Sequence, residues 1–135
     1  MEAKVRWLEG MRFVGTSGSG HAMVMDGDNP GSAPSPMEMI LLAIGGCSSV
    51  DVVSILQKAR QDVTDCEVEI KGLRADDHPR VFTDIELVFV VTGRGVQEKH
   101  VERAVNLSME KYCSVSKMLE KAANVRHSYR IVDLP

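Results

Sequence analysis

Cysteine is scarce in this chain of 135 residues, and no two cysteines lie close together in the sequence. Cys47, Cys66 and Cys113 are too few and too scattered for the disulfide framework of a small secreted domain. There is no C-x-x-C pair, and the four histidines show no metal-ligand spacing. We therefore expect free thiols in a reducing compartment, with no metal and no cofactor.

The chain also lacks long runs of one charge and an uninterrupted apolar leader. Its 16 Lys and Arg residues and 19 Asp and Glu residues are spread along the sequence, which argues against a nucleic-acid or basic membrane surface. Charged side chains, among them Arg6, Glu9, Arg12 and Asp26, interrupt the first thirty residues and argue against a secretory signal. We expect a cytoplasmic protein without a nucleic-acid partner.

Neither an internal repeat nor a low-complexity linker divides the sequence. A chain of this length is long enough to bury a core of its own. The sequence therefore predicts a single domain over residues 1–135.

Strand and helix patterns follow one another along the chain. Alternation of apolar and polar residues predicts strands, and apolar residues spaced by three to four predict helices. The predicted elements are strands at 3–9, 11–16 and 21–27, a loop at 26–35, a helix at about 36–60, a hairpin of strands at 66–74 and 81–92, a helix from 96 to about 113 that continues as a helix or turn, and a closing strand at 125–133. An antiparallel meander followed by helix, hairpin, helices and strand is an α+β arrangement.

The start of the long helix carries a clear signal. Ser35 and Glu38 form an S-x-x-E capping box, and Pro36 occupies the first helical position. In such a box each side chain satisfies a backbone N–H group that the first helical turn leaves free. Glu38 therefore already has a structural explanation.

The predicted long helix is apolar on every face. Residues 39–57 contain one charge, Asp51, and a helix of about 24 residues would run roughly 36 Å. Gly45-Gly46, two serines and Asp51 interrupt the apolar run and argue against a membrane span. One meander can cover only part of this surface. We therefore expect a homodimer in which two such helices pack together, with Gly45 and Gly46 permitting close approach.

Cys47 lies within this helix, and Asp51 follows four residues later. A free cysteine often serves as a small buried hydrophobe. Asp51 argues against that interpretation, because it shares a helix face with Cys47 and a carboxylate in apolar surroundings needs a hydrogen bond or a cation. The pair indicates a polar pocket. An anion by itself raises the pKa of a thiol, so a reactive Cys47 would need a compensating cation.

Two segments together resemble a known family. "SPMEMILLAIGGCSSVDVVSIL" carries Cys47, and "YCSVSKML" carries Cys113. The two segments, in the predicted order of elements, resemble the osmotically inducible protein C and organic hydroperoxide resistance (OsmC/Ohr) superfamily. The resemblance implies an intertwined homodimer with two long helices at its centre and a thiol pair at the subunit interface.

The resemblance also implies a chemistry. In the peroxidases of that family, the cysteine matching Cys47 attacks the O–O bond of an organic hydroperoxide and becomes a sulfenic acid. The cysteine matching Cys113 then condenses with it, and an external dithiol reduces the disulfide. On this basis we expect a thiol-dependent redox protein that acts on a small hydrophobic oxidant, with Cys47 as nucleophile, Cys113 as resolving residue and Glu38 as a further candidate site residue.

The sequence departs from the family pattern in two places. Gly18 stands where the peroxidases have a catalytic arginine, and Arg6 and Arg12 are the candidate substitutes. The family glutamate lies ten residues before the cysteine, where Met37 stands here, and Glu38 is one residue further on. The alternative function is therefore a non-catalytic, stress-protective or small-molecule-binding dimer. Cys66 lies outside the matched segments and is interpreted as a packing residue.

Overall fold

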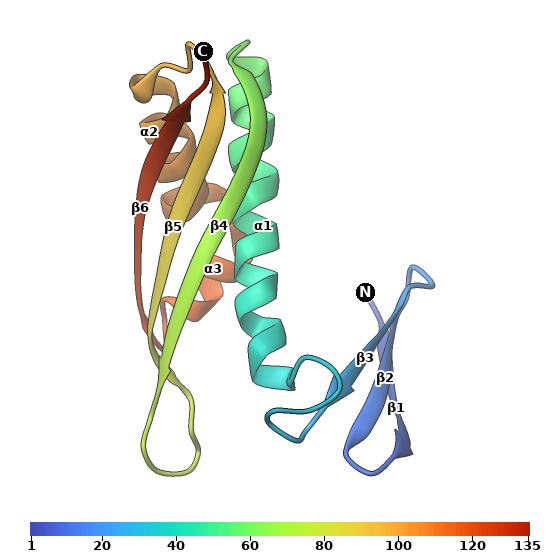
Figure 1. The fold of residues 1–135 in the computed structure, drawn as a ribbon. Coiled ribbons are helices and arrows are strands. Elements are labelled where there is room, and N and C mark those ends of the chain that lie inside the picture. Colours follow the sequence, from blue (N-terminus) through green and yellow to red (C-terminus); the bar gives the residue numbers. More distant parts are fainter. The chain divides into compact units, whose positions relative to one another are not determined.

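The computed structural model describes all residues from 1 to 135, which divide into two compact units, 1–40 and 41–135 (Figure 1). Two three-stranded sheets and one long helix make up most of the chain, so the predicted α+β class is confirmed. The single domain over residues 1–135 stays a prediction, and each unit is described by itself.

The first unit contains the predicted antiparallel meander. Its strands, in the order β1-β2-β3, are β1 (Ala3–Glu9), β2 (Arg12–Ser17) and β3 (Ala22–Asp26). Cross-strand partners share a face of a sheet, and the register places a row of apolar side chains on one face: Val5, Trp7, Phe13, Met23 and Met25. Trp7 and Val5 remain 64% and 62% exposed. This face has no covering layer within the unit.

The second unit is built on the other sheet. Its strands, in the order β4-β5-β6, are β4 (Asp62–Arg74), β5 (Phe82–Arg94) and β6 (Asn124–Asp133). The predicted hairpin and closing strand are confirmed, although β4 begins at Asp62 and Cys66 lies inside it rather than at its start. β6 is parallel to β5 because the intervening helices carry the chain back to the other end of the sheet.

The helices of this unit pack on one face of its sheet. The register aligns Ile70, Leu87 and His127 across the three strands, so these side chains share that face. α1 (Pro36–Lys58) approaches Ile70 so closely that a Cβ atom on Gly45 would lie 2.5 Å from Ile70 Cδ1. His127 Nε2 lies 3.0 Å from Asn106 Oδ1 of α2 (Glu98–Leu107). The core therefore lies between the sheet and these helices.

α1 is covered along one side only. Its buried positions include Ile44, Ser48, Val52 and Leu56, which recur every four residues. On the opposite side Leu42 is 56% exposed and Val50 is 70% exposed. By length and composition alone α1 could span a bilayer, a property that core helices of soluble proteins share. The chain by itself therefore covers only part of α1, in agreement with the sequence analysis, and burial of the open apolar face by a partner chain stays a prediction.

The predicted helix from 96 to 113 is divided into pieces. α2 is followed by a π-helical turn, η1 (Ser108–Tyr112), and then by α3 (Ser114–Leu119). The N–H of Cys113 donates to the carbonyl of Ser108 at 2.7 Å, which closes the wider turn. Cys113 itself has extended backbone angles and separates η1 from α3. Such π-turns are frequent at functional sites, which directs attention to Cys113.

Candidate functional site

The structure brings Cys47 and Cys113 together within the second unit. Cys47 lies on α1 and is partly exposed, whereas Cys113 lies between η1 and α3 and is fully buried. Cys47 acts on the pKa of Cys113, which places the two side chains near one another, and both thiols are free. Two free thiols that are 66 positions apart in the sequence therefore lie near one another in the fold.

Cys113 is held as a neutral thiol. Burial raises its pKa from the usual 9.0 to about 11, and the contact with Cys47 and the charge of Asp51 act in the same direction. The N–H of Ser116 donates to Cys113 Sγ at 3.4 Å, which lowers the pKa but does not offset the burial. Since the thiolate is the nucleophile, Cys113 is a slow attacking group at neutral pH.

Asp51 is satisfied by a serine that the sequence analysis missed. Ser108 Oγ lies 3.0 Å from Asp51 Oδ2 and 3.1 Å from the Ser48 carbonyl, so one hydroxyl donor serves two acceptors of α1. Ser108 opens the π-turn, and the buried hydroxyl of Ser48 donates to the carbonyl of Ile44 at 2.8 Å. The predicted polar pocket beside Cys47 is thus formed by Asp51 and serine hydroxyls.

The pocket holds an anion without an ion pair. The ion pairs of the chain join Arg12 to Glu9, Lys117 to Glu120, and Arg130 to Glu69, and none of them includes Asp51. Basic side chains do share a groove with Asp51, between α1 and α2. They are Lys58, His100 and Arg103. These three residues lie outside the family motifs, and no spacing in the sequence marks them as a group.

Glu38 acts as the capping residue of α1. Ser35 N donates to Glu38 Oε1 at 2.9 Å, and Glu38 N donates to Ser35 Oγ at 3.1 Å, which confirms the predicted capping box. These bonds to Ser35 lower the pKa of the Glu38 carboxyl. Along α1, Glu38 precedes Cys47 by nine residues, about two and a half turns, and projects from the opposite side of the helix. The two residues are therefore not neighbours on α1.

The capping box gives a direct prediction for stability. Ser35→Ala should lower the free energy of unfolding by about 1 kcal/mol, because the backbone N–H of Glu38 loses its acceptor. Ser35→Thr should retain most of that stability, since its hydroxyl can accept the same bond. Urea unfolding followed by circular dichroism measures both variants. Equal stability of Ser35→Ala and the wild type would contradict the role assigned to the box.

The candidate substitutes for the family arginine belong to the first unit. Gly18 follows β2, and a Cβ atom there would lie 3.1 Å from the carbonyl oxygen of Glu2, so larger side chains are accommodated only with a shift. Arg12 pairs with Glu9. Arg6 lines a pocket of about 430 Å³ on the meander. The thiols lie in the second unit.

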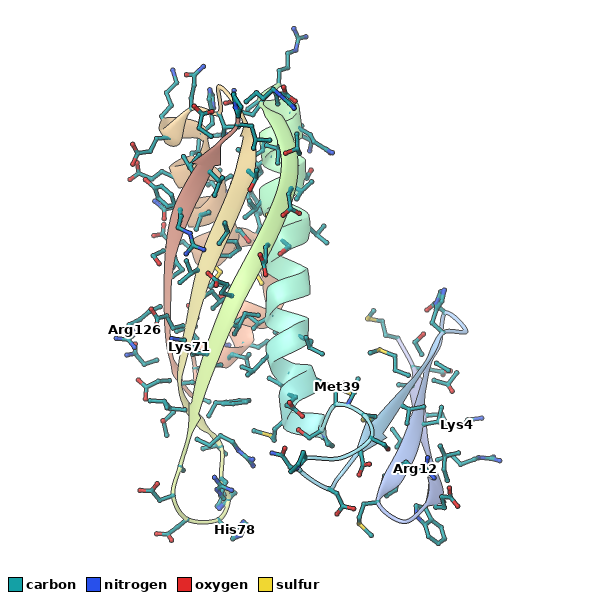
Figure 2. All side chains as sticks on the ribbon, viewed as in Figure 1. Lys4, Arg12, Met39, Lys71, His78 and Arg126 are labelled. Atoms are coloured by element: carbon teal, nitrogen blue, oxygen red, sulfur yellow. The ribbon has the colours of Figure 1, made fainter.

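The remaining candidate residues lie outside the thiol site. Cys66 is half-buried on β4, where burial and the neighbouring charge of Asp65 raise its pKa. His78 lies in the turn between β4 and β5, at the tip of the hairpin (Figure 2). No group of three or more His, Cys, Asp or Glu side chains is placed to hold a metal ion. Cys66 thus has the surroundings of a packing residue.

The arrangement of helix, sheet and thiol pair corresponds to a known class of protein. A sequence model of the OsmC-like protein family matches residues 27–128, and the chain belongs to this family. The family resemblance stated from the two cysteine segments is therefore confirmed, and OsmC-like proteins are generally soluble.

Individual relatives extend this assignment over nearly the whole chain. Protein YhfA of Escherichia coli K12 is 59% identical over 132 residues, which cover 98% of each protein. The crystal structure of a hypothetical protein from Aquifex aeolicus is 34% identical with a TM-score of 0.89, covering 99% of this chain and 97% of that one. The organic hydroperoxide resistance protein OhrB of Bacillus subtilis shares the fold at 18% identity and a TM-score of 0.65, covering 96% and 98%.

Proposed function

We propose that this protein is a thiol-dependent redox protein that reduces organic hydroperoxides through Cys47 and Cys113. The observation that carries the proposal is the proximity of two free thiols, Cys47 and Cys113, within one chain. Membership of the OsmC-like family, and the fold shared with organic hydroperoxide resistance proteins, support the choice of oxidant.

The reaction proceeds in three steps. The Cys47 thiolate attacks one oxygen of the O–O bond, an S–O bond forms, and the alcohol leaves after taking a proton. The Cys113 thiolate then attacks the Cys47 sulfur, the S–S bond forms, and the hydroxyl group leaves as water after taking a proton. An external dithiol supplies two electrons and returns both thiols by disulfide exchange.

The surroundings of the thiols favour slow turnover. Burial keeps Cys113 protonated at neutral pH, and Asp51 adds a negative charge without an ion-pair partner. A cation near a thiolate normally increases its population. These features also favour the second candidate function, a dimer that binds a small molecule and carries out little chemistry.

A homodimer is part of the proposal. The open apolar side of α1, with Leu42 and Val50, supports burial by a second copy of the chain. The uncovered apolar face of the meander, with Val5 and Trp7, supports a second contact of the same kind. We place this dimer in the cytoplasm, where the thiols would stay reduced between reactions.

Peroxide titration with peptide mapping tests the proposal. One equivalent of cumene hydroperoxide should produce an intramolecular disulfide between Cys47 and Cys113, with Cys66 still free. Cys47→Ser should abolish the reaction, because the attacking sulfur is gone. Cys113→Ser should leave a sulfenic acid on Cys47 that dimedone traps.

A matched control and a contrary result complete this test. Cys66→Ser should oxidise at the wild-type rate, since Cys66 lies on β4 and takes no part in the proposed reaction. If excess hydroperoxide leaves Cys47 reduced in the folded protein, the redox function is wrong and the small-molecule-binding function is favoured.

A further inference from the structure

Ser108 joins the segment that carries Cys113 to α1. Ser108 is fully buried, and its hydroxyl oxygen lies 3.1 Å from the carbonyl oxygen of Ser48 and 3.0 Å from Asp51 Oδ2. Both acceptors belong to α1, so this one hydroxyl supplies the hydrogen bonds between α1 and residues 98–119. Burial excludes water from the hydroxyl, and loss of these bonds would leave no solvent to replace them.

The main chain of Ser108 is engaged on both sides as well. Its N–H donates to the carbonyls of Ala104 and Val105 in α2, and its carbonyl accepts a hydrogen bond from the N–H of Cys113 at 2.7 Å. Ser108 thus uses its N–H on α2, its hydroxyl on α1 and its carbonyl on Cys113. Because all these bonds meet at one residue, a movement of Ser108 relative to α1 would also move the main chain of Cys113.

The first turn of α3 holds Cys113 from the other side. The N–H of Ser116 donates to Cys113 Sγ at 3.4 Å, and the N–H of Lys117 donates to the carbonyl of Cys113 at 3.0 Å. These bonds orient the sulfur relative to α3 and do not involve α1. The position of Cys113 relative to Cys47, which lies on α1, therefore depends on Ser108 and on apolar packing.

We propose that Ser108 is a positioning residue for the thiol pair: it fixes Cys113 relative to Cys47 and so determines how readily the two sulfurs form a disulfide. The inference rests on the proposed redox function, since it concerns the same two thiols. Disulfide geometry is demanding, because the two Cα atoms must lie within about 7 Å and their Cβ atoms must point towards one another. A misplacement of about 1 Å can slow a reaction between two positioned groups about a hundredfold.

Equilibration of the full-length protein with reduced and oxidised glutathione measures this effect without any hydroperoxide. Two electrons and two protons pass from the protein thiols to oxidised glutathione, which leaves as two molecules of glutathione while the Cys47–Cys113 disulfide forms. The Cys66→Ser background leaves only this pair to react. The equilibrium constant gives the effective concentration of one thiol towards the other. Ser108→Ala should lower it at least about tenfold, and Ser108→Thr, which keeps the hydroxyl, should recover most of the loss.

Val101→Ala is the matched control for lost stability. Val101 is fully buried on α2, seven residues before Ser108, and its side chain forms no hydrogen bond to α1. Truncating it should lower the free energy of unfolding, yet the effective concentration should stay within about threefold of the wild type, because the bonds of Ser108 remain. Circular dichroism and urea unfolding show that the variants are folded and how their stabilities compare.

Asp51→Asn separates the position of Cys113 from its charge environment. The amide oxygen can still accept the Ser108 hydroxyl, whereas the negative charge that raises the pKa of the Cys113 thiol is removed. Closure of a mixed disulfide between Cys47 and glutathione should therefore shift towards lower pH in Asp51→Asn. Ser108→Ala should instead slow closure by the same factor at pH 7 and pH 9.

The outcomes distinguish this inference from the redox function itself. Equal effective concentrations in Ser108→Ala and Val101→Ala would overturn the positioning role, even if hydroperoxide oxidises the wild-type pair. A loss that Ser108→Thr does not recover, or a pH shift in Ser108→Ala like that of Asp51→Asn, would also overturn it. A tenfold loss in Ser108→Ala that Ser108→Thr recovers would support the positioning role even if hydroperoxide leaves Cys47 reduced, and only the choice of oxidant would then be wrong.

Discussion

After Cys47 has been oxidised, closure of the disulfide with Cys113 should be about a hundredfold faster at pH 9 than at pH 7. The reason is the buried position of Cys113, which raises its pKa to about 11. Well below the pKa, the thiolate fraction increases about tenfold for each pH unit. Quenched-flow alkylation followed by mass spectrometry measures the closure rate directly.

The first oxidation step must be separated from this effect. In Cys113→Ser, trapping of the sulfenic acid with dimedone reports the pH dependence of Cys47 oxidation alone, and this rate serves as the control. A closure rate that is constant between pH 7 and pH 9 would show that Cys113 attacks from an environment different from the one described. Such a result would contradict the role of burial at this residue.

The raised pKa has a second consequence, for stability. A thiol whose pKa is higher in the folded than in the unfolded protein stabilises the fold in its neutral form. That contribution is fully present below the usual thiol pKa of 9.0 and is lost as the pH rises towards about 11. A further rise in pH from about 9 towards 11 therefore accelerates closure and also reduces the stability of the reduced protein.

Local patterns in the sequence predicted much of this fold. The capping box of Ser35 and Glu38, the alternation in the strands and the helical spacing of α1 each depend on residues near one another in the chain. The pairing of Cys47 with Cys113 could not be predicted in this way, because the two residues are far apart in the sequence and no local pattern connects them. It came from the resemblance to a family, and the fold accounts for it by placing η1 against α1.

The parts that the sequence did not predict depend on tertiary contacts. Nothing in the sequence around Ser108 distinguishes it from an ordinary surface serine. Only the π-turn directs its hydroxyl to Asp51. The basic residues of the groove come from two helices separated by the β4–β5 hairpin, so no spacing rule connects them. An all-round apolar pattern does not show which faces of α1 the chain itself buries, and only the fold shows that the side with Leu42 and Val50 stays open.

Gly46→Leu should dissociate the proposed homodimer while leaving the protomer folded. A Cβ atom on Gly46 would meet no other atom within 4 Å in the chain, so a larger side chain has room in the isolated protomer. Replacing a helical glycine should even favour the helix by nearly 1 kcal/mol. Overpacking against a second α1 would instead cost about 1–3 kcal/mol per protomer. Sedimentation equilibrium measures the dimer dissociation constant.

Gly45, the neighbouring glycine, serves as the comparison for Gly46→Leu. A side chain on Gly45 would collide with Ile70 of β4, so Gly45→Leu should lower the stability of the protomer itself. Gly46→Ala adds one methyl group and should weaken the dimer less than Gly46→Leu. A wild-type protein that is monomeric at micromolar concentration would refute the dimer. A Gly46→Leu protein that dimerises as tightly as the wild type would place the interface on another face, because the added side chain would then still project into solvent.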